Sequence, residues 1–155
     1  MPKLDARTIV LLYNPDQTQV LLLRRSPEKA LWPNLITGIG GKVELILGEA
    51  SDIRASLLRE VAEEVPQLAV EDIANLHLRL VSHYSSIDEI VVLSWYTGQL
   101  LKDLPNLTCS EGVLEWAAIG KLPLPEMIPR AAVSIPFIMS LSHDDLMVYD
   151  GIYKH

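Results

Sequence analysis

The stretch GGKVELILGEASDIRASLLREVAEEVPQL, residues 40–68, decides how the rest of the chain is interpreted. After two glycines it enters a segment whose apolar side chains recur every four residues, which predicts a helix from about Asp52 to Val65. Ser51 is a suitable cap for the start of that helix. Pro66 restricts the backbone of the preceding residue and marks the end. The stretch therefore predicts a glycine-rich bend that leads into one amphipathic helix.

The polar side of this helix carries three carboxylates. Glu60, Glu63 and Glu64 share a face because residues three and four apart are neighbours on a helix. Like charges this close repel, so at least one carboxyl group should hold its proton more tightly than usual. One interpretation is a solvated acidic face, since Glu favours helices. The other is a cage for a hard divalent cation such as Mg²⁺, which binds carboxylate oxygens and retains waters that substrate phosphates can replace.

The residues before the helix favour the metal cage. Glycines allow the backbone to approach a phosphate or a metal ion closely. Lys42, which follows the glycine pair directly, offers a cation for a phosphate group. A solvated helix face would need neither feature.

Composition limits the class of protein. The chain has 155 residues, of which 49% are apolar and 21% charged, so we expect one domain over residues 1–155 with a substantial core. The net charge of -7 argues against binding of nucleic acid polymers or of anionic membranes. Cys109 is the single cysteine, which excludes an internal disulfide. No apolar run approaches the roughly 20 residues of a membrane helix, and a cytoplasmic location is expected.

The flanking segments predict a mixed sheet with helices packed on it, in the α/β or α+β class. Apolar runs separated by turn residues predict strands, and one further apolar segment predicts a helix despite an internal proline. The predicted elements are a hairpin over residues 7–25, strands over 75–84, 89–100 and 113–119, a second helix over 126–142 and a last strand near an edge within 145–155.

The opening stretch resembles the signature sequence of the Nudix hydrolases, and TGIGGKVE, residues 37–44, is typical of the MutT-like members of that family. Weaker similarity extends to the arginine pair that ends the predicted hairpin, Arg24 and Arg25, and to residues 91–100 and 111–125. The resemblance implies an α/β/α sandwich with a mixed β-sheet. The residues that match the signature are Gly41, Glu49, Arg59, Glu60, Val61, Glu63 and Glu64.

The loop before the helix departs from the family pattern. The segment between Gly41 and Glu49 and the segment between Glu49 and Arg59 are each two residues longer than in the family. The family spacing counted back from Arg59 reaches Ser51, which has no carboxylate. The loop carboxylate is therefore either Glu49 or Glu44. Pro66 stands where the family has its closing glycine. None of these changes affects the spacing of the helical carboxylates.

The resemblance implies a site for Mg²⁺ or Mn²⁺. Glu60 and Glu64 would be the main ligands, and Glu63 a further ligand or the general base. The backbone carbonyl at Gly40 or Gly41 would complete the set of ligands.

Other residues receive roles from the same resemblance. Arg59 would orient the loop carboxylate. If Arg24 and Arg25 lie on a strand, they point in opposite directions, so at most one of them should face the site. Arg25 is the favoured phosphate contact, and a solvated strand end is the alternative. Lys42 is a second phosphate contact. Glu115 would lend a carboxylate to the metal. Separately from the resemblance, Trp116 is the tryptophan favoured for stacking on the base because it follows Glu115, and a place in the core is the alternative.

The implied activity is hydrolysis of a nucleoside diphosphate linked to another group. The first candidate substrate is a nucleoside triphosphate, for example an oxidised one such as 8-oxo-dGTP, cleaved to a nucleoside monophosphate and pyrophosphate. Thr37 stands where readers of oxidised purines often have Asn. The alternatives are a pyrophosphatase of ADP-ribose, nucleotide sugars or dinucleotides, and a catalytically weakened nucleotide-binding domain. The family includes monomers and homodimers.

Overall fold

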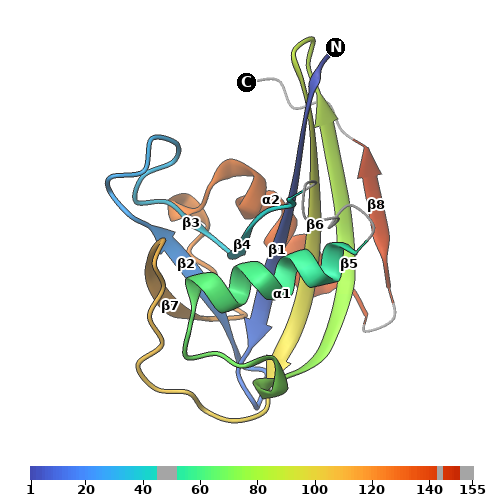
Figure 1. Ribbon diagram of the computed structural model, residues 1–155. Helices are drawn as coiled ribbons and strands as arrows, with labels where there is room; N and C mark the ends of the chain where they lie inside the picture. The colour runs from blue at the N-terminus through green and yellow to red at the C-terminus, as the bar shows by residue number, and fades with distance from the viewer. Residues whose placement is uncertain (45–51, 143–144, 151–155) are drawn as a thin grey trace.

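The structure is a computed structural model that describes residues 1–44, 52–142 and 145–150. One eight-stranded sheet forms the centre of the molecule, and α1 and α2 pack on its opposite faces (Figure 1). The protein therefore has the mixed α+β architecture that the sequence predicts.

The sheet contains both parallel and antiparallel neighbours. Its main path runs β3-β2-β1-β6-β5-β8, while β4 pairs with β1 and β7 pairs with β2. The β1–β6 and β5–β8 pairs are parallel, and the other pairs are antiparallel. The strands are β1 (Lys3–Tyr13), β2 (Gln19–Arg25), β3 (Ile36–Thr37), β4 (Ile39–Lys42), β5 (Ile73–Ser85), β6 (Glu89–Leu100), β7 (Gly112–Ala118) and β8 (Met147–Asp150).

The predicted hairpin over residues 7–25 is confirmed. β1 and β2 are antiparallel, with Leu12 opposite Leu21. The turn between them is held by Asn14, whose side-chain oxygen accepts hydrogen bonds from the backbone N–H groups of Thr18 and Gln19, both at 2.9 Å. An Asn side chain that bonds nearby backbone in this way closes a turn without help from the sheet.

Helix α1 (Ile53–Glu64) agrees with the predicted helix over Asp52 to Val65. Its cap is Asp52, whose carboxylate accepts from the N–H of Ala55 at 3.0 Å. The sequence favoured Ser51 for this role, and Ser51 lies outside the described residues. The apolar side of α1, with Leu57 and Val61, packs on a core cluster that includes Val10, Leu12, Leu21 and Tyr96.

Helix α2 (Pro129–Ser140) covers the other face, where Ala131, Ile135 and Ile138 pack against Leu11, Leu80 and Trp95. Pro129 occupies the first helical position, where the missing N–H breaks no intrahelical bond. The helix continues through Pro136, and it begins three residues later than predicted because a separate 3₁₀ turn, Leu124–Glu126, precedes it. In the part of the chain that the structure describes, no helix has the length and apolarity to cross a lipid bilayer.

The predicted last strand corresponds to β8, which pairs in parallel with β5 at the end of the sheet path. It is shorter than the predicted segment, and residues 151–155 lie outside the described residues.

Candidate active site

The glycine bend brings the backbone of β4 against the carboxylates of α1. A Cβ atom added to Gly41 would lie 2.1 Å from Oε2 of Glu60, and one added to Gly40 would lie 1.9 Å from the carbonyl oxygen of Thr8. β4 is thus enclosed between the main chain of β1 and the acidic side of α1. Only glycine fits there, because any side chain would collide with backbone or with a carboxylate.

Glu64 is the most buried of the three carboxylates. Glu64 is 7% exposed, and its Oε2 atom has no hydrogen-bond partner among the described residues. Burial, and then the negative charge of Glu60, raise the pKa of Glu64 to about 7, although the backbone N–H of Gly40 donates to it. The prediction that one carboxyl group holds its proton more tightly than usual is confirmed.

Arg59 holds the other two carboxylates. Its guanidinium lies 2.9 Å from Oε1 of Glu60 and 3.1 Å from Oε2 of Glu63, and it donates to the carbonyl oxygen of Lys42 at 3.0 Å. The side chain of Glu63 is 60% exposed, so this carboxylate points to solvent more than the other two. Arg59 therefore orders the acidic side of its own helix and joins it to the end of β4.

The loop carboxylate is not settled by this arrangement. Glu49 lies outside the described residues. Glu44 lies just beyond β4 and is half-buried. The orienting role predicted for Arg59 toward either residue stays a prediction.

The described residues can hold part of a divalent metal site. Glu60 offers hard oxygen donors beside Gly41, and Glu64 offers them beside the backbone of Gly40. The unpaired Oε2 of Glu64 suits a cation better than it suits an apolar interior. Within the described residues, however, no three His, Cys, Asp or Glu side chains are grouped as a metal cage. Among the described residues, the fit therefore rests on Glu60 and Glu64.

A cavity of about 420 Å³ lies beside the glycine bend, which is within the usual size range of small-molecule sites. It extends from Gly40 and Gly41 along β1 and β6 to the start of α2. Its walls combine apolar, aromatic and charged groups. They include Arg7, Arg25, Trp32, Tyr84, Trp95 and Arg130.

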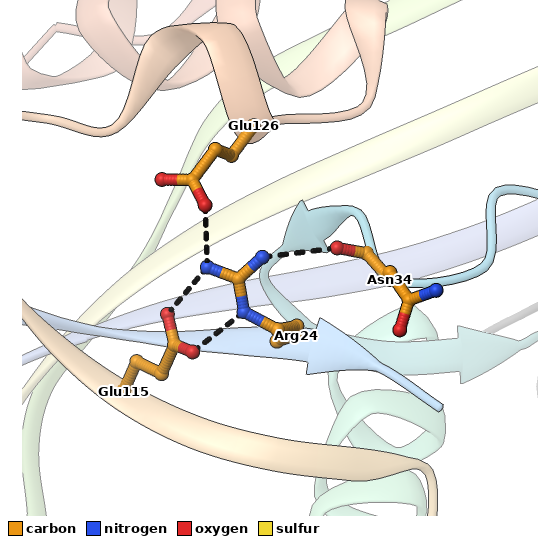
Figure 2. A network of polar contacts seen from close by, with 4 residues as sticks. All are labelled: Arg24, Asn34, Glu115 and Glu126. Carbon is orange, nitrogen blue, oxygen red and sulfur yellow. Dashed lines mark hydrogen bonds and ion pairs between the residues drawn. The ribbon is translucent and has the colours of Figure 1, made fainter. Parts of the chain in front are cut away.

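The two adjacent arginines at the end of β2 point to different surroundings. Figure 2 shows Arg24 at the centre of a network with Glu115, Glu126 and the carbonyl oxygen of Asn34. Its Nε lies 2.6 Å from Oε1 of Glu115, and its Nη2 lies 3.2 Å from Oε2 of Glu115 and 3.0 Å from Glu126. Arg24 thus joins β2, β7 and the turn before α2, and has a structural role.

Arg25 lines the cavity instead. Its Nε donates to the carbonyl oxygen of Leu31 at 3.1 Å. Burial lowers the pKa of Arg25, the charge of Arg7 lowers it further, and the charge of Glu64 raises it. A guanidinium that is partly desolvated beside a second arginine favours an anion as its ligand. The strand alternation expected for this pair is present, and the phosphate contact itself stays a prediction.

Glu115 and Trp116 lie away from the cavity lining. β7 places Glu115 opposite Leu22, whose side chain packs beneath α2, and both Glu115 oxygens face Arg24. A metal role for Glu115 stays a prediction, and it requires Arg24 to release the carboxylate. Trp116 is opposite Leu21 and is not among the residues that line the cavity, whereas Trp32 and Trp95 are.

The sequence analysis missed several charged and aromatic residues of the cavity, among them Asp5, Arg7, Tyr84, Glu89 and Arg130. Asp5 and Arg7 lie near the start of β1, where alternating charged residues look like a solvated strand end. Tyr84 and Arg130 come from β5 and α2, and the guanidinium of Arg130 lies 4.3 Å from the centre of the Tyr84 ring. Lys42, predicted as a phosphate contact, is exposed at the end of β4 and is not part of the lining.

Comparison with known proteins defines the family. The NUDIX domain profile matches residues 3–137, which is most of the chain. The chain therefore belongs to the Nudix family of hydrolases. No curated protein sequence matches it.

Solved structures with the same fold are distant in sequence. The MutT protein from Methanosarcina mazei Go1 superposes with a TM-score of 0.65 at 17% identity, covering 88% of this chain and 94% of that one. A NUDIX hydrolase from Nitrosomonas europaea gives 0.71 at 16% identity, covering 99% and 80%. An Ap4A hydrolase from C. elegans gives 0.62 at 15% identity, covering 87% and 92%. At these identities the similarity establishes the fold.

Proposed function

We propose that this protein is a metal-dependent hydrolase of a nucleoside diphosphate linked to another group, with a nucleoside triphosphate as the first candidate substrate. The observation that carries the proposal is Glu64, a buried carboxylate with an unpaired oxygen and a pKa of about 7. It lies beside the glycine bend that borders the cavity. Perturbed carboxylates next to a cavity are characteristic of catalytic sites.

Different residues would bind the metal ion, accept the proton and bind the phosphate. Glu60 and Glu64 would hold Mg²⁺ or Mn²⁺, and Glu63, which is more exposed, is available to accept a proton from the attacking water. When bound, the cation supplies neutralisation of charge on the phosphate oxygens. Arg25 would bind a phosphate group that the cation does not reach, because it lines the cavity that borders the glycine bend.

Two other substrate classes are candidates besides nucleoside triphosphates. One structural relative is named as an Ap4A hydrolase. Another, from Francisella tularensis, is named as a bifunctional NMN adenylyltransferase and ADP ribose pyrophosphatase, with a TM-score of 0.70 at 17% identity over 89% of this chain and 41% of that one. Dinucleotides and ADP-ribose are therefore the alternative substrates for this chain.

The test is a panel of the common dNTPs, 8-oxo-dGTP, ADP-ribose and Ap4A, each with Mg²⁺ and with EDTA. Pyrophosphate release indicates a triphosphate substrate, whereas AMP with ribose phosphate indicates ADP-ribose. Glu64→Gln should lose orders of magnitude in turnover and stay folded, and Glu71→Gln on an exposed turn should change nothing. Metal-independent turnover, or full activity of Glu64→Gln, would contradict the proposal. Metal-dependent nucleotide binding without turnover would instead indicate a catalytically weakened domain.

A further inference from the structure

Three residues that line the cavity carry a buried polar atom with no hydrogen-bond partner among the described residues: Oδ1 of Asp5, Oγ1 of Thr8 and Nε1 of Trp95. The side chain of Asp5 is 15% exposed and Trp95 is 1% exposed. A carboxylate oxygen accepts hydrogen bonds, and an indole N–H only donates them. Buried polar groups are nearly always paired, so an unpaired acceptor and an unpaired donor in one cavity indicate a ligand that supplies the opposite groups.

The carboxylate of Asp5 is held in one orientation. Its Oδ2 accepts a hydrogen bond from Nε of Arg7 at 3.0 Å. Asp5, Arg7 and Leu11 are separated by even numbers of residues along β1, so their side chains point to the same face of the sheet. On that face Leu11 packs in the core beneath α2 together with Trp95. Asp5 therefore faces the same side of the sheet as α2, and Oδ1 is left for a ligand while Oδ2 is occupied.

Asp5 lies toward the end of the cavity that is away from the carboxylates of α1. The pairing of β1 with β4 sets Thr8 opposite Gly41, and Asp5 is three residues farther along the strand, or roughly 10 Å at the usual rise per residue. The walls at this end include the Tyr84 ring, on which Arg130 stacks. A substrate whose phosphates lie at the glycine bend would direct its other end toward Asp5.

We propose that Asp5 selects the substrate by accepting a hydrogen bond from an N–H group of a nucleobase. The inference rests on the proposed function and specifies its substrate, because a carboxylate requires an imino or amino N–H at this place and rejects a ring nitrogen or carbonyl oxygen. A sugar hydroxyl is a donor of the same kind. The base is favoured because the aromatic ring of Tyr84 forms part of the cavity wall at this end, where Tyr84 and Asp5 both lie opposite Val91.

Asp5→Asn tests this proposal because it reverses the polarity of the site. The Nε–H of Arg7 lies against Oδ2, so the amide oxygen, which can accept that hydrogen bond, is expected to take the place of Oδ2. The amide NH₂ group then takes the place of Oδ1, where it donates instead of accepting. The substitution keeps the shape of the side chain, and it should therefore change which base is preferred.

Binding is measured at equilibrium with Ca²⁺ present, using dATP, dCTP, dGTP, dTTP, ADP-ribose and inorganic pyrophosphate. Asp5→Asn should weaken the tightest-binding dNTP by about 10- to 100-fold and reorder the four bases, while pyrophosphate, which has no base, stays within about twofold. An N-methylated form of the preferred base should bind wild type weakly and lose nothing further in the variant. Asp103→Asn, in an exposed loop, is the matched control.

Three results would overturn the assignment of Asp5. Equal weakening of every probe, including pyrophosphate, would mean that Asp5 only supports the fold. Unchanged dNTP binding would mean that no base reaches it, and a loss confined to ADP-ribose would place a sugar hydroxyl there instead. Each of these results leaves the proposed hydrolase standing, since that proposal is tested separately by metal-dependent turnover and by Glu64→Gln.

Discussion

Replacement of Glu64 by Gln should make the metal-free protein more stable at pH 8 while abolishing its activity. Glu64 is buried, and its pKa rises from an ordinary 4.5 to about 7. Gln is a neutral side chain of the same shape, so it resembles the protonated carboxyl group without the cost of burying a charge. A pKa displacement of this size corresponds to at most about 3 to 4 kcal/mol of unfolding free energy.

The sign of the pH dependence follows from the protons bound. Between about pH 4.5 and pH 7 the folded state binds more protons at Glu64 than the unfolded state does, so wild type loses stability as the pH rises through this window. Below about pH 4.5 the contribution of protonated Glu64 to the unfolding free energy is fully present, and above about pH 7 this contribution is lost. Glu64→Gln should lack this slope.

The assay is urea denaturation in EDTA at pH 5, 6, 7 and 8, for wild type, Glu64→Gln and the exposed control Glu71→Gln. The two Gln variants should diverge as the pH rises, with only Glu64→Gln becoming more stable than wild type. Adding Mg²⁺ at pH 8 should stabilise wild type and leave Glu64→Gln unchanged, because a ligand that binds only the folded state shifts its stability. If Glu64→Gln were less stable than wild type at pH 8 without metal, the burial argument would be refuted.

Three further predictions concern neighbouring residues. Gly41→Ala should reduce metal affinity and turnover at least tenfold, as measured by Mn²⁺ titration and kinetics, because its Cβ atom would displace the carboxylate of Glu60. Glu115→Gln should leave Mn²⁺ affinity and turnover unchanged and lower the unfolding free energy by about 1 kcal/mol, since it weakens the contacts with Arg24; reduced metal affinity would establish the predicted metal role. Asp52→Ala should cost about 1 kcal/mol in urea denaturation with no change in KM, because it removes only the cap of α1.

Local sequence signals were sufficient to predict the elements that carry the acidic side chains. The four-residue apolar spacing placed α1, and Leu57 and Val61 of that spacing are indeed buried. The alternation of strand residues predicted that only one of the two arginines ending β2 would face the site, and it is Arg25 that lines the cavity. Such signals are reliable because they depend on the period of one element and on nothing beyond it.

The far end of the cavity was not predictable in this way. Asp5 looks like part of a solvated strand end, and only the parallel pairing of β1 with β6 places it beside the residues of β5 and α2. Trp116 was favoured for the base because it follows Glu115, but β7 turns these neighbours to opposite faces, and Glu115 bonds to Arg24. Proximity in the chain is a poor guide to a pocket that several strands assemble.

The glycine pair links catalysis to stability in this fold. Gly40 and Gly41 have no room for a side chain, because Thr8 bounds β4 on one side and Glu60 on the other. Backbone therefore faces Glu64, and the single N–H of Gly40 compensates only in part for the buried charge. A cation at this place would neutralise the charge that the protein leaves uncompensated. Metal binding and folding should consequently be coupled, so that the sequence which makes the site competent also makes the metal-free protein less stable above pH 7.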